Sequence, residues 1–174
     1  MKRLLIFASI IVVFCLYCII SEELDLRKMA TVEGRQAVIS EKYEGAVIRS
    51  EKEVEGYIIS AFDKGEKHGY FVFKPVEEGK YDYLTRSSLW EKSRLVFGTL
   101  DITENNSYEV FVCGDERIEY LEVTIQDTYT GKLLQQEQIS LEDSCVAVLK
   151  RDPIVWAWQV EVVGYDAEGN AHKL

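Results

Sequence analysis

The chain has 174 residues and a formal net charge of -10 at pH 7, so it is long enough for one domain with a hydrophobic core and short for two. Beyond residue 20, 18 basic residues face 30 acidic ones, a net charge of -12. So acidic a surface repels nucleic acid and anionic lipid headgroups, and we expect no nucleic-acid partner.

An uninterrupted apolar segment, LLIFASIIVVFCLYCII, occupies residues 4–20. It follows Lys2 and Arg3 and is followed at once by acidic residues. As a helix it would measure about 25 Å, close to the hydrocarbon thickness of a bilayer. Basic residues before such a segment favour a cytoplasmic N-terminus. Residues 1–21 are therefore predicted to be a single-pass anchor, a transmembrane helix that leaves the rest of the chain extracytoplasmic at the cell membrane.

Two other fates of this segment stay open. Signal cleavage, which would release a secreted protein, requires small residues at the cleavage site, whereas the segment ends in Cys18, Ile19 and Ile20. A lipoprotein signal requires a small residue before the modified cysteine, but Cys15 follows Phe14 and Cys18 follows Tyr17. The anchor is the leading interpretation.

A charged stretch and then a β-pattern follow the apolar segment. Residues 22–42 are charged and only loosely periodic, which indicates a linker that can hold a short helix. From Tyr43 to the C-terminus the apolar period changes to two. This pattern predicts ten strands, near residues 44–50, 55–63, 68–75, 80–86, 94–102, 107–113, 118–127, 132–139, 145–150 and 154–166.

Turn residues separate the predicted strands, and hairpins are expected to close through Gly131 and through Gly169. Many short strands with tight turns are typical of an all-β domain. We therefore predict an antiparallel β-sandwich of two sheets over residues 43–174, with immunoglobulin-like topology as the leading arrangement. The Cys-Trp-Cys spacing of antibody domains is missing.

Paired aromatic residues are candidate binding surfaces. Trp156 and Trp158 share one face of a strand with Val160 and Val162, so core packing explains them better than an exposed stacking row. Trp90 lies between strands without periodic context. It is therefore the candidate for a surface contact.

The cysteines give one candidate crosslink. Cys113 ends one apolar run and Cys145 begins another, so the two can face each other and form a disulfide in an oxidising compartment. Two separate buried thiols are the alternative. Cys15 and Cys18 lie inside the apolar segment without a charged neighbour and are interpreted as ordinary apolar residues.

No pattern in the sequence predicts catalysis, a cofactor or a metal site. His68 and His172 are the only histidines, too few for a His-rich metal site, and no nucleophile motif accompanies them. We therefore expect a non-enzymatic module that contacts another envelope or membrane protein through edge strands or the Trp90 segment. A glycan-binding module and an acid–base hydrolase using carboxylates are the alternatives.

Overall fold

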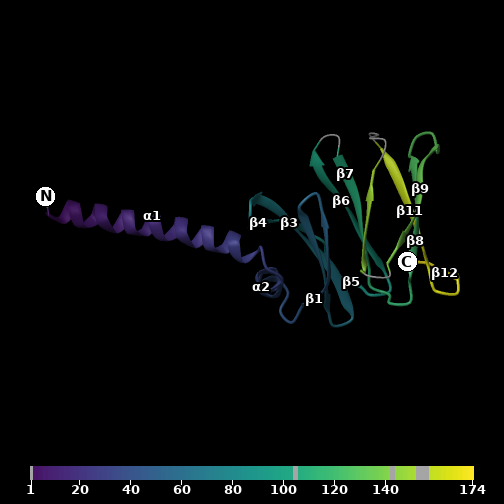
Figure 1. Cartoon of the computed structure of the whole chain (residues 1–174), viewed down its shortest axis with the longest axis horizontal. Coiled ribbons are helices and arrows are strands. Elements are labelled where there is room, and N and C mark those ends of the chain that lie inside the picture. The colour runs from purple at the N-terminus through teal and green to yellow at the C-terminus, as the bar shows by residue number, and fades with distance from the viewer. Residues whose placement is uncertain (1, 104–105, 142–143, 152–156) are drawn as a thin grey trace.

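Two helices precede the sheets. The computed structural model describes residues 2–103, 106–141, 144–151 and 157–174, with side chains from residue 10 onward. Helix α1 (Lys2–Lys28) runs without a break from the apolar segment into the charged one, and α2 (Val32–Lys42) follows after a short turn. Figure 1 shows α1 projecting from one end of the β-structure. The linker predicted over residues 22–42 is thus helical along most of its length.

The projecting part of α1 is apolar and contacts little else. Its large apolar side chains between Ile10 and Ile20 are each 53% to 69% exposed. Among the described residues, no helix combines the length and apolarity that crossing a membrane requires. The transmembrane helix predicted over residues 4–20 is therefore not found among the described residues. The side chains of residues 4–9 are not among those that the structure describes.

Helix α2 is fixed to the first strand by a buried arginine. Thr31 caps the helix, its hydroxyl oxygen accepting a hydrogen bond from the backbone N–H of Gly34 at 3.1 Å. The Arg35 guanidinium donates to the Met29 carbonyl at 2.9 Å and to both carboxylate oxygens of Glu51 at 2.8 and 2.6 Å. This bidentate pair joins the turn after α1, helix α2 and the sheet below them.

Sheet A lies beneath the helices. Its antiparallel strands follow the order β1-β2-β3-β4, and the short β5 pairs with the other end of β3. The strand bounds are β1 (Val47–Val54), β2 (Tyr57–Lys64), β3 (Lys67–Glu77), β4 (Lys80–Arg86) and β5 (Trp90–Glu91).

Two further antiparallel sheets contain the rest of the chain. Sheet B has the order β10-β7-β6, and sheet C has the order β12-β11-β8-β9. Sheet B consists of β6 (Leu95–Thr103), β7 (Asn106–Cys113) and β10 (Val146–Lys150). Sheet C consists of β8 (Tyr120–Asp127), β9 (Leu133–Ser140), β11 (Trp158–Tyr165) and β12 (Ala171–His172).

The helices and the three sheets stack as successive layers, from α2 through sheets A and B to sheet C (Figure 1). Three apolar clusters fill the spaces between the layers. The helix-facing core contains Met29, Ile39, Phe62, Phe71 and Phe73. The core between sheets A and B contains Ile59, Val72, Val96, Val110 and Val112, with other buried residues. The core between sheets B and C includes Phe111, Ala147, Leu121, Val123 and Ile125.

Most of the predicted β-structure is confirmed. Each of the ten predicted strands overlaps a strand of the structure. The hairpins through Gly131 and Gly169 join β8 to β9 and β11 to β12, with both glycines at positive φ. The all-β antiparallel class is therefore confirmed, and only the two-residue strands β5 and β12 were not predicted.

The prediction of two sheets needs correction, because the strands before Leu95 form a third one. Strand β7 explains the difference. Its residues from Ser107 to Cys113 are all buried, with Val110 and Val112 facing sheet A and Phe111 facing sheet C. A strand covered on both faces belongs to a middle layer.

Candidate interaction site

An exposed groove lies where strand β6 begins. It has a volume of about 630 Å³, and it joins the segment before β6 to the C-terminal end of the chain. The residues that line it are Trp90, Ser93, Arg94, Leu95, Val96, Phe97, Lys173 and Leu174. We call it the Trp90 groove.

The segment carrying Trp90 is fixed to sheet A by backbone and side-chain contacts. Trp90 pairs with His68 across β5 and β3. The Lys92 backbone N–H donates to the Glu66 carbonyl at 3.1 Å, and its ammonium group lies 2.8 Å from a carboxylate oxygen of Asp63. The segment that carries Trp90 into the groove is therefore held in place against sheet A.

Buried His68 holds the C-terminal end of the same segment, at Arg94. Its Nε2 donates to the Arg94 carbonyl at 2.7 Å when the proton is on that nitrogen, and the residue is 1% exposed. Burial lowers the pKa of His68, although its bond to the Arg94 carbonyl opposes this shift. A neutral, buried imidazole positions the segment and is not available as a solvent-facing base.

Aromatic and cationic side chains form the exposed part of the groove. Trp90 is 43% exposed and Phe97 is 60% exposed. The Arg94 guanidinium lies 5.7 Å from the centre of the Trp90 ring, within cation–π range. Tryptophan and arginine are the residues most enriched at the energetic centres of protein interfaces.

Phe97 is exposed because β6 is an edge strand. It lies directly opposite Phe111 of β7, so the two side chains share the face of sheet B that is turned toward sheet C. Phe111 is fully buried, whereas nothing in the described chain covers Phe97 in the same way. The apolar space between sheets B and C is thus open along β6.

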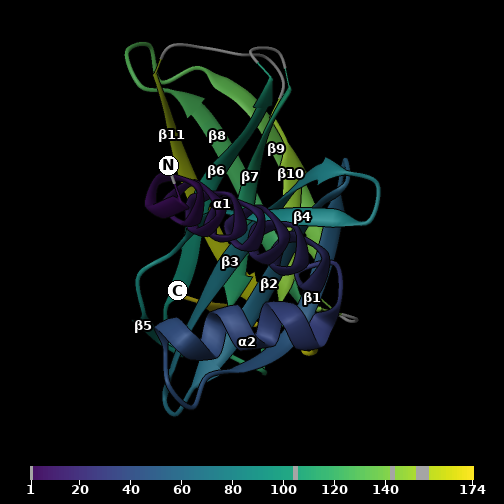
Figure 2. The same cartoon turned by 90° about the vertical axis from the view of Figure 1, so that its left-hand side faces the viewer.

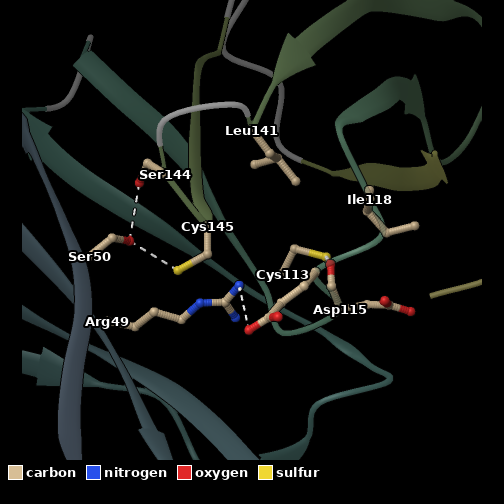
Figure 3. Close-up of a pocket in the computed structure, with 9 residues that line it drawn as sticks. Arg49, Ser50, Cys113, Asp115, Ile118, Leu141, Ser144 and Cys145 are labelled. Carbon is tan, nitrogen blue, oxygen red and sulfur yellow. Dashed lines mark hydrogen bonds and ion pairs between the residues drawn. The ribbon is translucent and has the colours of Figure 1, made fainter. Parts of the chain in front are cut away.

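A second cavity, of about 280 Å³, contains both domain cysteines (Figure 3). The backbone N–H of Cys113 donates to the Cys145 carbonyl at 2.9 Å, but both side chains are free thiols. The Cys145 sulfur lies 3.0 Å from the Ser50 hydroxyl, while Cys113 packs into the core between sheets B and C. The residues predicted to form a disulfide are adjacent, and their sulfur atoms point away from each other (Figure 3).

The chemistry available in this second cavity is limited. Burial raises the pKa of Cys113 to about 11 and also raises that of Cys145, so both thiols stay protonated. The Arg49 guanidinium donates to the Gly114 carbonyl at 3.3 Å and lies 3.6 Å from a Glu116 carboxylate oxygen. Asp115 is paired with Arg117. The charged groups beside the thiols therefore already have partners.

The other predicted positions have different outcomes. Trp158 is partly buried beside the core between sheets B and C, and the Arg151 guanidinium lies 3.7 Å from its ring centre. Trp156 lies outside the described residues. In the part of the chain that the structure describes, no group of three or more His, Cys, Asp or Glu residues could hold a metal ion.

Trp90 was the only residue of the groove identified from the sequence. A signal for Phe97 was present, because it shares its face of the predicted strand with Thr99 and Asp101. This face mixes apolar Leu95 and Phe97 with polar residues, whereas the other face carries Val96, Leu100 and Ile102, so the mixed face is expected to be the less covered one. Nothing in the local sequence connected Lys173 and Leu174 to Trp90, since these residues meet through the tertiary packing of the segment between β5 and β6 beside the end of sheet C.

Comparison of the chain with protein-family models, with curated proteins and with solved structures gives no match.

Proposed function

We propose that this protein is a non-enzymatic interaction module, held at the outer face of a cell membrane by residues 4–20, that binds another envelope or membrane protein through the Trp90 groove. One observation carries the proposal. Exposed Trp90, Arg94 and Phe97 lie together at β6, an edge strand whose outer edge has no partner among the described strands. Protein interfaces favour such side chains, and edge strands offer unpaired backbone groups.

Membrane attachment is supported by the side chains of α1. Large apolar residues from Ile10 to Ile20 remain more than half exposed, and burying them in lipid would remove them from water. The step from Lys2 and Arg3 to Glu22 and Glu23 supports an outward-facing domain.

The strand order supports immunoglobulin-like topology for residues 95–172. In that nomenclature β6, β7 and β10 correspond to strands A, B and E, while β8, β9, β11 and β12 correspond to C, C′, F and G. This assignment places strands A and G, with the Trp90 groove between them, on one side of the sandwich.

A photo-crosslinking amino acid at Phe97 tests the proposed contact in intact cells. We expect one discrete protein adduct that mass spectrometry identifies. The same amino acid at Tyr129, which is 85% exposed on the β8–β9 hairpin, is the matched control and should give no such adduct. Identical products at both positions, or no adduct at Phe97, would contradict a contact in the groove.

Glycan binding is the second candidate function, favoured by the exposed ring of Trp90. Aromatic rings stack on the apolar faces of sugars, and binding would change the fluorescence of Trp90. Titration with cell-surface glycans distinguishes the two functions. A saturable change that Trp90→Ala abolishes would favour the glycan, and an unchanged signal would reject it.

A further inference from the structure

One side of the sandwich formed by sheets B and C has two unpaired strand edges. Strand β12 pairs only with Gly164 and Tyr165 of β11, so β11 from Trp158 to Val163 has a described partner strand only on its β8 side. Among the described strands, β6 likewise pairs with β7 alone. Figure 2 shows β11 and β6 on the same side of the molecule.

Apolar side chains remain at this open side. Leu95, Val160 and Val162 belong to the partly buried border of the core between sheets B and C, and Phe97 is 60% exposed. An additional strand along β6 would pair the free backbone groups and cover Phe97 at the same time.

The charges in the Trp90 groove indicate the chemical character of an added strand. The Arg94 guanidinium contacts the Trp90 ring. Among the described residues, neither Arg94 nor Lys173 has a carboxylate partner. Both cations are exposed in a chain whose net charge is -10. An acidic ligand would neutralise them and would approach this end of β6 preferentially.

We propose that the Trp90 groove binds an extended segment of a partner protein as an added strand along β6. An apolar side chain of that segment packs on Phe97 and Leu174, and an acidic side chain pairs with Arg94 and Lys173. This inference rests on the proposed function, since it names the kind of partner that the groove accepts.

Selection of random peptides of about ten residues against the full-length chain in detergent tests the proposal. Peptides that also bind the Phe97→Lys variant are discarded. We expect the remaining peptides to carry an acidic and an apolar residue two positions apart, because alternate residues share a face of a strand. Arg94→Glu should weaken their binding about tenfold or more. Lys132→Glu, a charge reversal on the β8–β9 turn, should leave it unchanged.

N-methylation of single peptide bonds then identifies the backbone geometry. An added strand donates hydrogen bonds from alternate residues only, so we expect methylation to abolish binding at every second position and to be tolerated between them. Helical binders, binders insensitive to methylation or to Arg94→Glu, or no groove-dependent binder at all would overturn strand addition. A Phe97 crosslink in cells would in that case leave the proposed function standing, whereas its absence would reject both.

Discussion

Arg35 shows how one residue couples the helices to the sheet. Its side chain is 5% exposed, and that of its partner Glu51 is 18% exposed. The carboxylate also accepts a hydrogen bond from Ser60. The pKa of Glu51 is lowered although burial opposes the shift, because Arg35 and Ser60 hydrogen-bond to the charged form. The pair therefore depends on all three groups.

We expect Arg35→Met to lower the free energy of unfolding by about 3–5 kcal/mol, because it leaves a buried carboxylate without its cation. The matched control is Arg27→Met, which removes an exposed pair with Glu23 and should change stability by less than about 1 kcal/mol. Urea unfolding followed by tryptophan fluorescence measures both values. Equal effects would show that the Arg35 pair has no special role.

His68 makes stability depend on pH. Burial lowers its pKa below the ordinary 6.5, so the unfolded chain binds the proton more readily than the folded one. The stability associated with neutral His68 is then complete above pH 6.5 and declines as the pH falls below that value.

We therefore expect the free energy of unfolding to fall more steeply for the native chain than for His68→Gln between about pH 7 and about pH 5. Urea unfolding at a series of pH values measures the difference. Asp63, Lys92 and Arg49, which surround the imidazole, are present in both proteins. Parallel profiles would contradict a contribution from His68.

At the level of elements, the close approach of the first turn of α2 to the end of α1 requires glycine at position 34. A Cβ atom at Gly34 would lie 1.8 Å from the Lys28 carbonyl oxygen and 2.4 Å from its carbonyl carbon. Neither backbone atom can move without displacing one helix against the other.

Gly34→Ala should therefore destabilise the chain by about 1–3 kcal/mol, as overpacking does, despite the better helix propensity of alanine. Thermal unfolding monitored by circular dichroism gives the change. Glu33→Ala, an exposed substitution in the same turn of α2, is the control and should have little effect. A Gly34→Ala variant as stable as the native chain would show that the helices separate easily.

Strands β6 and β7 provide a matched comparison within one pair. Phe111→Ala should cost about 3–5 kcal/mol, because it opens a cavity in the core between sheets B and C. Phe97→Ala, directly opposite, should change stability by about 0.5 kcal/mol or less because its ring is mostly exposed. Chemical denaturation of the two variants separates these values, and similar losses would mean that Phe97 belongs to the core.

The sequence was sufficient to place the strands and insufficient to place the sheets. Alternation and turn glycines act over a few residues, which is why the hairpin through Gly131 was predicted correctly. Assignment of a strand to a middle layer depends on what covers its second face. In β7 the signal was the run Val110-Phe111-Val112, which is apolar on both faces but also fits an ordinary buried strand.

In the candidate site, too, local features were predicted from the sequence and side-chain directions were not. Trp90 was identified because it lacks a periodic context, and the structure places it in an exposed groove. The adjacency of Cys113 and Cys145 was also anticipated, but their sulfur atoms diverge because Cys145 precedes β10 and turns toward Ser50. Side-chain direction outside a strand could not be obtained from alternation.

For the whole molecule, the proposed placement of residues 4–20 in a membrane would set how far each layer of the domain lies from the lipid. The Lys80 ammonium group contacts Glu23 of α1 at 2.8 Å, so the β3–β4 turn lies beside the helix, whereas the β8–β9 hairpin lies at the far end (Figure 1). A fluorophore at Glu78 should therefore be quenched more strongly by a headgroup-linked quencher in vesicles than one at Tyr129. Equal quenching would contradict a fixed orientation.

Helix α1 continues past Ile20 to Lys28 without a break, a distance of about 12 Å. With residues 4–20 in a membrane, a short rigid helix would connect the domain to the lipid, and the domain could not reorient as it could on a flexible linker. The Trp90 groove would then face sideways at nearly constant height above the lipid. Such a geometry would restrict encounters with a partner to a thin layer parallel to the membrane. It would favour partners that present an extended segment at the height of the Trp90 groove.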